Sequence, residues 1–232
     1  MLTRDYFMLE KIEKTMGKNQ QFSIIWLHGL GADGSDFEAI IPELNLPSES
    51  QIKFIFPHAP IRPITINNGF EMRGWYDISN LASIDADIDV TGIESSIAEI
   101  TKLIEKERKN GILAENIILA GFSQGGVIAA LTGLIYKEKL GGLLLLSTYL
   151  PKWDYFKEKL NTNNLSMPVT IAHGLYDPIV PFRAGEYLKN QLDALNMPVS
   201  FYNYPMEHSI CPEEIHMIRD FFCQTLNLEC IL

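Results

Sequence analysis

The sequence predicts an α/β fold, with a mostly parallel central sheet covered by helices on both faces, in one domain over residues 1–232. Short aliphatic and β-branched runs alternate along the chain with segments of helical period, which is the pattern of such a sheet. The length of 232 residues and the hydrophobic share of 47% suit one domain with a large core. Catalytic and binding sites in such folds form in loops at the carboxyl ends of the strands, so we expect the functional residues there.

The elements follow from runs bounded by Gly, Pro or Asn. Buried strands are predicted at residues 23–27, 53–56, 116–120, 142–147, 169–172 and 199–204, with a weaker edge strand at 7–12. Helices are predicted at residues 91–110, 123–136, 182–195 and 212–226. Residues 60–90 show no convincing period yet are rich in large apolar side chains. This segment is expected to be either a lid-like or pocket loop, or a passive cover.

Charge and composition exclude several classes of protein. The formal net charge of −10 disfavours binding to nucleic acid. The N-terminal residues do not resemble a signal peptide, and no apolar run is long enough for a transmembrane segment. The chain has three cysteines, an odd number, and all lie near the C-terminus. We therefore expect reduced thiols rather than a disulfide framework, and a cytoplasmic location.

A candidate nucleophile lies between a predicted strand and a predicted helix. Gly121-Phe122-Ser123-Gln124-Gly125 has the form G-x-S-x-G. A sharp strand-to-helix turn exposes the serine Oγ, and the helix N-terminus directs N–H groups toward developing negative charge. Ser123 is therefore predicted to be the nucleophile. A Cys211–His208 pair is the rival, but it lacks this structural context.

A serine hydroxyl needs a base, and histidine has a suitable pKa. In this kind of site the acid follows the serine and the histidine follows the acid. His208 lies in the loop between the last strand and the last helix, whereas His173 ends a strand and His216 lies within a helix. Asp177, in a turn after the strand at 169–172, is the preferred acid. Asp154 is the alternative, in a setting typical of a helix N-terminus.

An oxyanion needs about two fixed donors. One is expected to be the N–H of Gln124, directly after the nucleophile. The other is expected from His28-Gly29-Leu30-Gly31, which follows the strand at 23–27, and we assign it to the N–H of Leu30. His28 then braces this loop. A plain glycine turn is the alternative interpretation of the motif.

Several ordered motifs together resemble one family. They are the His28 to Phe37 segment, Phe56 to Pro60, Met72 to Ile78, Gly121 to Gly126, His173 to Pro178 and the His208 loop. In this order they resemble the phospholipase/carboxylesterase family, which includes acyl-protein thioesterases and small bacterial carboxylesterases. The resemblance implies an α/β-hydrolase fold, hydrolysis of carboxylic esters or thioesters, no cofactor and no metal. It implies that Ser123, Asp177 and His208 form the triad, and that Leu30 and Gln124 supply the oxyanion donors.

The same resemblance places Trp75 beside the acyl pocket, and we expect Met72 and Leu30 to contact the substrate as well. The expected partner is a small acyl ester, a lysophospholipid or an S-acylated protein. A serine peptidase or amidase on the same fold, and a non-catalytic binding protein on a hydrolase scaffold, are the alternatives. Apolar residues in the 60–90 segment are compatible with a homodimer.

Overall fold

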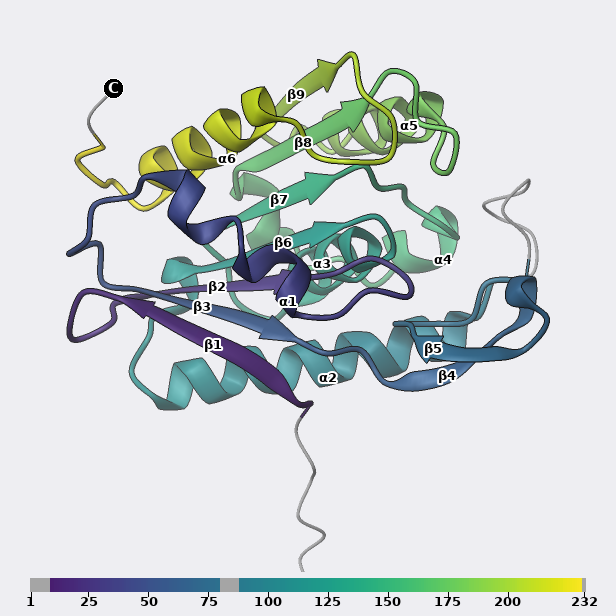
Figure 1. Ribbon diagram of the computed structural model, residues 1–232, viewed down its shortest axis with the longest axis horizontal. Helices are drawn as coiled ribbons and strands as arrows, with labels where there is room; N and C mark the ends of the chain where they lie inside the picture. Colours follow the sequence, from purple (N-terminus) through teal and green to yellow (C-terminus); the bar gives the residue numbers. More distant parts are fainter. Residues whose placement is uncertain (1–8, 80–87, 231–232) are drawn as a thin grey trace, which may run out of the picture.

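The computed structural model describes residues 9–79 and 88–230, and its centre is a twisted sheet (Figure 1). The seven strands are ordered β1-β3-β2-β6-β7-β8-β9. They are β1 (Lys11–Met16), β2 (Phe22–Leu27), β3 (Ile52–Pro57), β6 (Ile117–Phe122), β7 (Gly142–Leu146), β8 (Val169–Gly174) and β9 (Val199–Tyr204). Every neighbouring pair is parallel except β1 and β3, which are antiparallel. The predicted α/β fold is confirmed.

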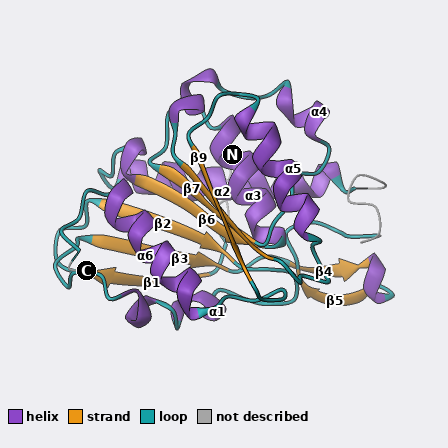
Figure 2. Cartoon of the chain, turned by 90° about the horizontal axis from the view of Figure 1, so that it is seen from above, coloured by secondary structure: helices purple, strands orange, loops and turns teal. Residues whose placement is uncertain are grey.

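Helices cover both faces of the sheet (Figure 2). They are α1 (Ser35–Glu38), α2 (Val90–Lys109), α3 (Gln124–Ile135), α4 (Trp153–Lys157), α5 (Phe182–Asp193) and α6 (Pro212–Thr225). One core cluster packs α2, α3 and α5 against strand residues such as Ile25 and Leu27. The other packs α1 and α6 against their neighbours Ile24 and Trp26, which point to the opposite face. Central strands are therefore apolar on both sides, as β7 shows with five buried residues.

Two expectations about the sheet need correction. The edge strand predicted at residues 7–12 is found at Lys11–Met16, while residues 7 and 8 lie outside the described residues. The segment from residue 60 onward, predicted to lack regular structure, contains an antiparallel hairpin of β4 (Ile61–Ile64) and β5 (Phe70–Arg73). These strands are short or charged and are held by backbone pairing, so side-chain period does not reveal them. Leu81, also in the predicted loop, lies outside the described residues.

The expectation of reduced thiols is contradicted at the C-terminus. Cys223, near the end of α6, forms a disulfide with Cys230, and the two Cα atoms are 6.0 Å apart. The tail after α6 turns back along the helix, with the Leu228 N–H bonded to the Cys223 carbonyl at 2.8 Å, which brings the two sulfurs together. Cys211 is free. Among the described helices, none combines the length and the apolar character that crossing a membrane requires.

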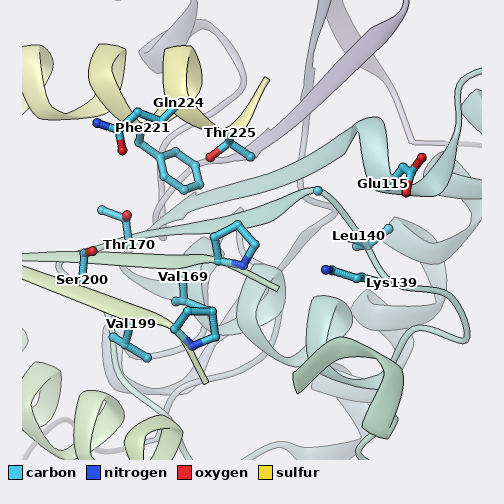
Figure 3. A pocket seen from close by; sticks show the side chains of 13 residues that line it. Glu115, Lys139, Leu140, Val169, Thr170, Val199, Ser200, Phe221, Gln224 and Thr225 are labelled. Atoms are coloured by element: carbon cyan, nitrogen blue, oxygen red, sulfur yellow. The ribbon is translucent and has the colours of Figure 1, made fainter. Parts of the chain in front are cut away.

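The carboxyl ends of the parallel strands hold the candidate catalytic residues, whereas a pocket lies at their amino ends. The turn after β6, the loop after β8 and the loop after β9 hold Ser123, Asp177 and His208, all at the carboxyl edge. At the amino edge, an open pocket of about 560 Å³ lies between the starts of β7, β8 and β9 and the end of α6 (Figure 3). Its lining includes Pro168, Pro198 and Phe221. This pocket is therefore separated from the candidate site by the length of the sheet.

Candidate active site

Ser123 lies in a strained turn between β6 and α3. Its backbone has φ 53° and ψ −122°, a conformation that costs a non-glycine residue free energy and persists only where its surroundings enforce it. The Ser123 N–H donates to the Leu146 carbonyl at 2.9 Å, and the Thr148 hydroxyl donates to the Ser123 carbonyl at 2.7 Å. Both contacts come from the end of β7 and the residues after it. The peptide groups on either side of the serine are thus fixed.

The turn also requires glycine on both sides of the serine. A Cβ at Gly121 would lie 2.4 Å from the Gly125 carbonyl oxygen, and a Cβ at Gly125 would lie 2.4 Å from the His28 carbonyl oxygen. Either would be far inside van der Waals contact with backbone that cannot move away. The G-x-S-x-G spacing therefore lets α3 approach both its own strand and the loop after β2.

Asp177 and His208 form a hydrogen-bonded pair across two loops. The His208 Nδ1 lies 2.7 Å from Asp177 Oδ2, and because a carboxylate only accepts, the Nδ1–H is the donor. The other carboxylate oxygen of Asp177 accepts from the N–H groups of Ile179 at 2.9 Å and Val180 at 2.8 Å. Burial alone would raise the pKa of Asp177, but these hydrogen bonds outweigh it and hold the pKa below its ordinary value. An ionised acid thus directs Nε2 of His208 away from itself as a free acceptor.

The imidazole lies beside the turn that carries the serine. The ring of Phe122, the residue before Ser123, is 4.7 Å from the His208 ring between centroids. Ser123 itself is 9% exposed, so it is mostly enclosed. The structure therefore gathers Ser123, Asp177 and His208 at one edge of the sheet.

The loop after β2 lies directly against the serine. A Cβ at Gly29 would be 3.5 Å from the Ser123 Cβ and 3.4 Å from the Phe122 ring. Among the described residues, the Leu30 N–H has no hydrogen-bond acceptor, whereas the next N–H, of Gly31, donates to the Arg73 carbonyl oxygen at 2.8 Å. The Gln124 N–H is the first of α3 and therefore has no acceptor within the helix. Among the described residues, two N–H groups without a hydrogen-bond acceptor therefore flank Ser123.

His28 fixes this loop through hydrogen bonds made by both of its ring nitrogens. Its Nδ1 lies 2.7 Å from the Gly29 carbonyl oxygen, and its Nε2 accepts from the Ala59 N–H at 3.0 Å. Burial lowers the pKa of His28 to about 4, so the ring is neutral near pH 7, with its proton on Nδ1. The ring is fully buried. Its geometry is that of a brace and not of a base.

Trp75 packs on the same loop from the other side. It is fully buried, and its indole Nε1–H donates to the His28 carbonyl at 2.8 Å. Its own backbone is held by the Gln124 side chain, which accepts from the Trp75 N–H at 2.8 Å and donates to the Tyr76 carbonyl at 2.8 Å. Gln124 therefore presents one backbone N–H toward Ser123 and uses its side chain to fix the segment that packs on the loop after β2.

The remaining sequence candidates fall at different distances from this centre. Met72, in β5, has its sulfur 3.6 Å from a Cβ built at Gly31, so it lies beside the loop after β2. His216 lies within α6, and Asp154 lies in the first turn of α4; among the described residues the carboxylate bonded to His208 is that of Asp177. Contact of Trp75, Met72 and Leu30 with a substrate stays a prediction.

Two roles were missed by sequence reasoning: the Gln124 side chain and the buried His173, whose imidazole contacts the Asp177 turn. Each of these side chains bonds to backbone atoms of a loop outside its own helix or strand. Backbone atoms are common to all residue types, so the partners leave no pattern. The position of His173, four residues before the candidate acid at the end of a buried strand, is the one available signal.

Comparison with known proteins agrees with this geometry. The phospholipase/carboxylesterase family matches residues 9–226. Acyl-protein thioesterase 1 of Yarrowia lipolytica is 37% identical over 211 residues, covering 88% of this chain and 92% of the relative. Acyl-protein thioesterase 1 of Mycosarcoma maydis is 35% identical over 224 residues, covering 90% and 93%.

Solved structures show the same architecture. The crystal structure of Arabidopsis thaliana SOBER1 superposes with a TM-score of 0.83 at 30% identity, covering 88% of this chain and 99% of that one. Acyl-protein thioesterase 2 of Zea mays has a TM-score of 0.81 at 24% identity, covering 94% and 99%, and supports the fold alone. The fold and the match over nearly the whole length agree: the chain belongs to the phospholipase/carboxylesterase family of α/β hydrolases.

Proposed function

We propose that this chain is a serine hydrolase of carboxylic esters and thioesters, in which Ser123 is the nucleophile, His208 the general base and Asp177 the acid that orients the histidine. The observation that carries the proposal is the 2.7 Å hydrogen bond from His208 Nδ1 to Asp177 Oδ2, made beside the strained Ser123 turn. This bond fixes the tautomer in which Nε2 is free to accept a proton. Membership of the family supports the same reaction class.

The reaction proceeds by two acyl transfers. Ser123 Oγ attacks the carbonyl carbon while its proton passes to His208 Nε2, and Asp177 stabilises the imidazolium that forms. The carbonyl oxygen becomes an oxyanion that the N–H groups of Leu30 and Gln124 bind. The alcohol or thiol then leaves with the proton from His208. A water molecule, deprotonated by the same histidine, hydrolyses the acyl-enzyme and restores the serine.

The rim of the site favours a substrate with an apolar acyl chain. Leu175, Tyr176 and Ile179 flank Asp177 and are 40%, 66% and 46% exposed. Ile61 and Phe70 of the β4–β5 hairpin are also exposed. Exposed large apolar side chains of this kind are suited to contact an apolar group. With relatives named acyl-protein thioesterases, this supports S-acylated protein as the substrate, ahead of lysophospholipid or a small ester.

Three expectations remain proposals: a lid-like element, a homodimer and a cytoplasmic location. The β4–β5 hairpin extends beyond the carboxyl edge of the sheet (Figure 1), where a lid-like element would lie. Its exposed Ile61 and Phe70 are the residues through which a homodimer would pack. For the cytoplasmic location, the glutathione pool there would keep Cys223 and Cys230 reduced, so a count of free thiols in protein isolated from cells tests it.

The test compares Ser123→Ala with wild type on p-nitrophenyl esters of increasing acyl length, an S-acyl peptide and the matching N-acyl amide. We expect the variant to lose at least about a thousandfold in kcat on all substrates. Ser166→Ala changes an exposed serine before β8, at the opposite edge, and should retain the wild-type rate. Unfolding curves check that both variants are folded.

The outcomes separate the alternatives. Hydrolysis of the ester and thioester but not the amide, with Ser123 labelled by a fluorophosphonate probe, supports the proposal. Faster cleavage of the amide would identify a peptidase or amidase. A folded wild type that neither turns over any substrate nor reacts with the probe would indicate a non-catalytic binding protein.

A further inference from the structure

A buried histidine that the proposed mechanism does not use lies directly beneath the acid. His173 is at the carboxyl end of β8 and is fully buried. Burial lowers its pKa below the ordinary value of 6.5 despite its hydrogen bond to the Val180 carbonyl. Near neutral pH the ring is therefore uncharged and has one N–H group to donate.

The contacts of the ring fix which nitrogen carries the proton. Nε2 lies 2.8 Å from the Val180 carbonyl oxygen, which can only accept, so Nε2 is the donor. Nδ1 has no hydrogen-bond partner among the described residues, and it faces Gly185 of α5. The imidazole thus makes one hydrogen bond, and it makes it to the turn that carries Asp177.

Val180 is held at both of its backbone groups. Its N–H donates to Asp177 Oδ1 at 2.8 Å, and its carbonyl accepts from His173. The second oxygen of Asp177 bonds to His208 at 2.7 Å and lies 3.6 Å from the His173 Nε2. The Val180 N–H and carbonyl belong to the two peptide groups on either side of its Cα, so a displacement of Val180 would carry its N–H away from Asp177 Oδ1 and release the plane of the carboxylate. The hydrogen bond from His173 to the carbonyl opposes that displacement.

We propose that His173 is a positioning residue for the reaction: through Val180 it sets the orientation of the Asp177 carboxylate toward His208. This inference rests on the proposed triad. Because Asp177 acts on the imidazolium that forms in the transition state, its misorientation lowers kcat and leaves KM nearly unchanged. A residue needed only for folding would lower the amount of active enzyme instead, without changing the turnover of the molecules that remain folded.

The first experiment compares His173→Leu with His173→Gln. The two side chains have similar size, but only glutamine retains an N–H that reaches toward the Val180 carbonyl. Active sites are titrated with a fluorophosphonate so that rates refer to folded enzyme. We expect kcat to fall by about 100-fold in His173→Leu, with KM within about twofold, and to recover at least about tenfold in His173→Gln. Equal kcat values in the two variants would overturn the proposal.

A double-mutant cycle tests the route of the effect. In an Asp177→Asn background the carboxylate that His173 positions is gone, so adding His173→Leu should change kcat by less than about threefold. A full additional loss of about 100-fold would show that His173 acts elsewhere, and would refute the inference while leaving the triad intact. Conversely, if wild type has no esterase activity, the proposed function itself fails.

A third variant tests the ring position without removing it. A Cβ at Gly185 would lie 2.4 Å from His173 Nδ1, so Gly185→Ala must displace the imidazole, while alanine suits the α5 helix. The matched control is Gly133→Ala in α3, whose Cβ would lie 2.5 Å from a methyl group of Leu143 in the core. We expect kcat to fall at least about tenfold only in Gly185→Ala. Equal kcat in the two glycine variants would count against positioning by His173.

Discussion

Glu214 gives the protein a pH-dependent stability that a single isosteric substitution should remove. The residue lies in the first turn of α6, directly after the loop that carries His208, and its side chain is fully buried. Burial raises its pKa to about 8 from an ordinary value of 4.5, and neither carboxyl oxygen has a hydrogen-bond partner among the described residues. Tyr204 and Cys211 are the titratable groups that interact with it.

The sign follows from proton binding in the two states. Below about pH 4.5 the carboxyl is protonated both folded and unfolded, and it adds no pH dependence. Between pH 4.5 and about 8 the unfolded chain has lost this proton while the folded chain keeps it, so stability falls as the pH rises. The difference of about 3.5 pH units, at about 1.4 kcal/mol per unit, corresponds to about 5 kcal/mol above pH 8. At pH 7 the same slope gives about 3 kcal/mol.

Urea unfolding of Glu214→Gln and wild type from pH 5 to pH 9 measures this directly. Glutamine has the same shape and does not ionise, so the variant should gain stability relative to wild type as the pH rises, by several kcal/mol over this range. Glu213→Gln is the matched control, because the neighbouring side chain is exposed and its pKa is lowered. A stability difference between Glu214→Gln and wild type that stays constant from pH 5 to pH 9 would refute the argument.

Two further substitutions test contacts that are seen in the structure and were not expected from the sequence. Gln124→Met keeps the length of the side chain but leaves the Trp75 N–H and the Tyr76 carbonyl without partners in a buried site, so unfolding free energy should fall by about 2–6 kcal/mol. The exposed Gln224→Met should change it by less than about 0.5 kcal/mol, and similar losses in both would contradict the assignment. Cys230→Ser opens the short loop that the disulfide closes, and should lower stability by about 2.5 kcal/mol in oxidising buffer but not in dithiothreitol. An identical loss in both buffers would mean that the bond contributes nothing.

The sequence predicts the central strands and long helices well because their buried positions require apolar side chains, which recur with the period of the strand or helix. β7 is buried on both faces and is therefore a continuous aliphatic run, and α2 alternates between a buried and a charged face. The strands that were misplaced or missed, β1, β4 and β5, lie outside this two-sided core. They are defined by backbone hydrogen bonds, and because every residue has a carbonyl and only proline lacks the N–H, their side chains carry little information about them.

Near the candidate site, the sequence likewise predicts residues that follow buried strands but not contacts that depend on the path of the backbone. Ser123, Asp177 and His208 can be identified because each follows a recognisable strand, and because parallel strands bring their carboxyl ends to one edge. The disulfide between Cys223 and Cys230 could not be anticipated, because it depends on the path of the chain after α6. Cysteine number and spacing alone do not specify that path.

Stability and turnover are coupled at this site through three buried polar side chains. His28, Gln124 and His173 are at most 1% exposed, and each hydrogen-bonds to the backbone of a loop at the catalytic edge. An apolar replacement leaves a buried peptide group unpaired, which costs about 1–3 kcal/mol, and it releases the same loop. For an ordinary core residue the lost free energy is spread over dispersion contacts with many neighbours. Here it is concentrated in one or two hydrogen bonds whose direction sets the position of a donor or a carboxylate. Substitutions at these three positions should therefore lower kcat more, per kcal/mol of lost stability, than substitutions in the apolar clusters.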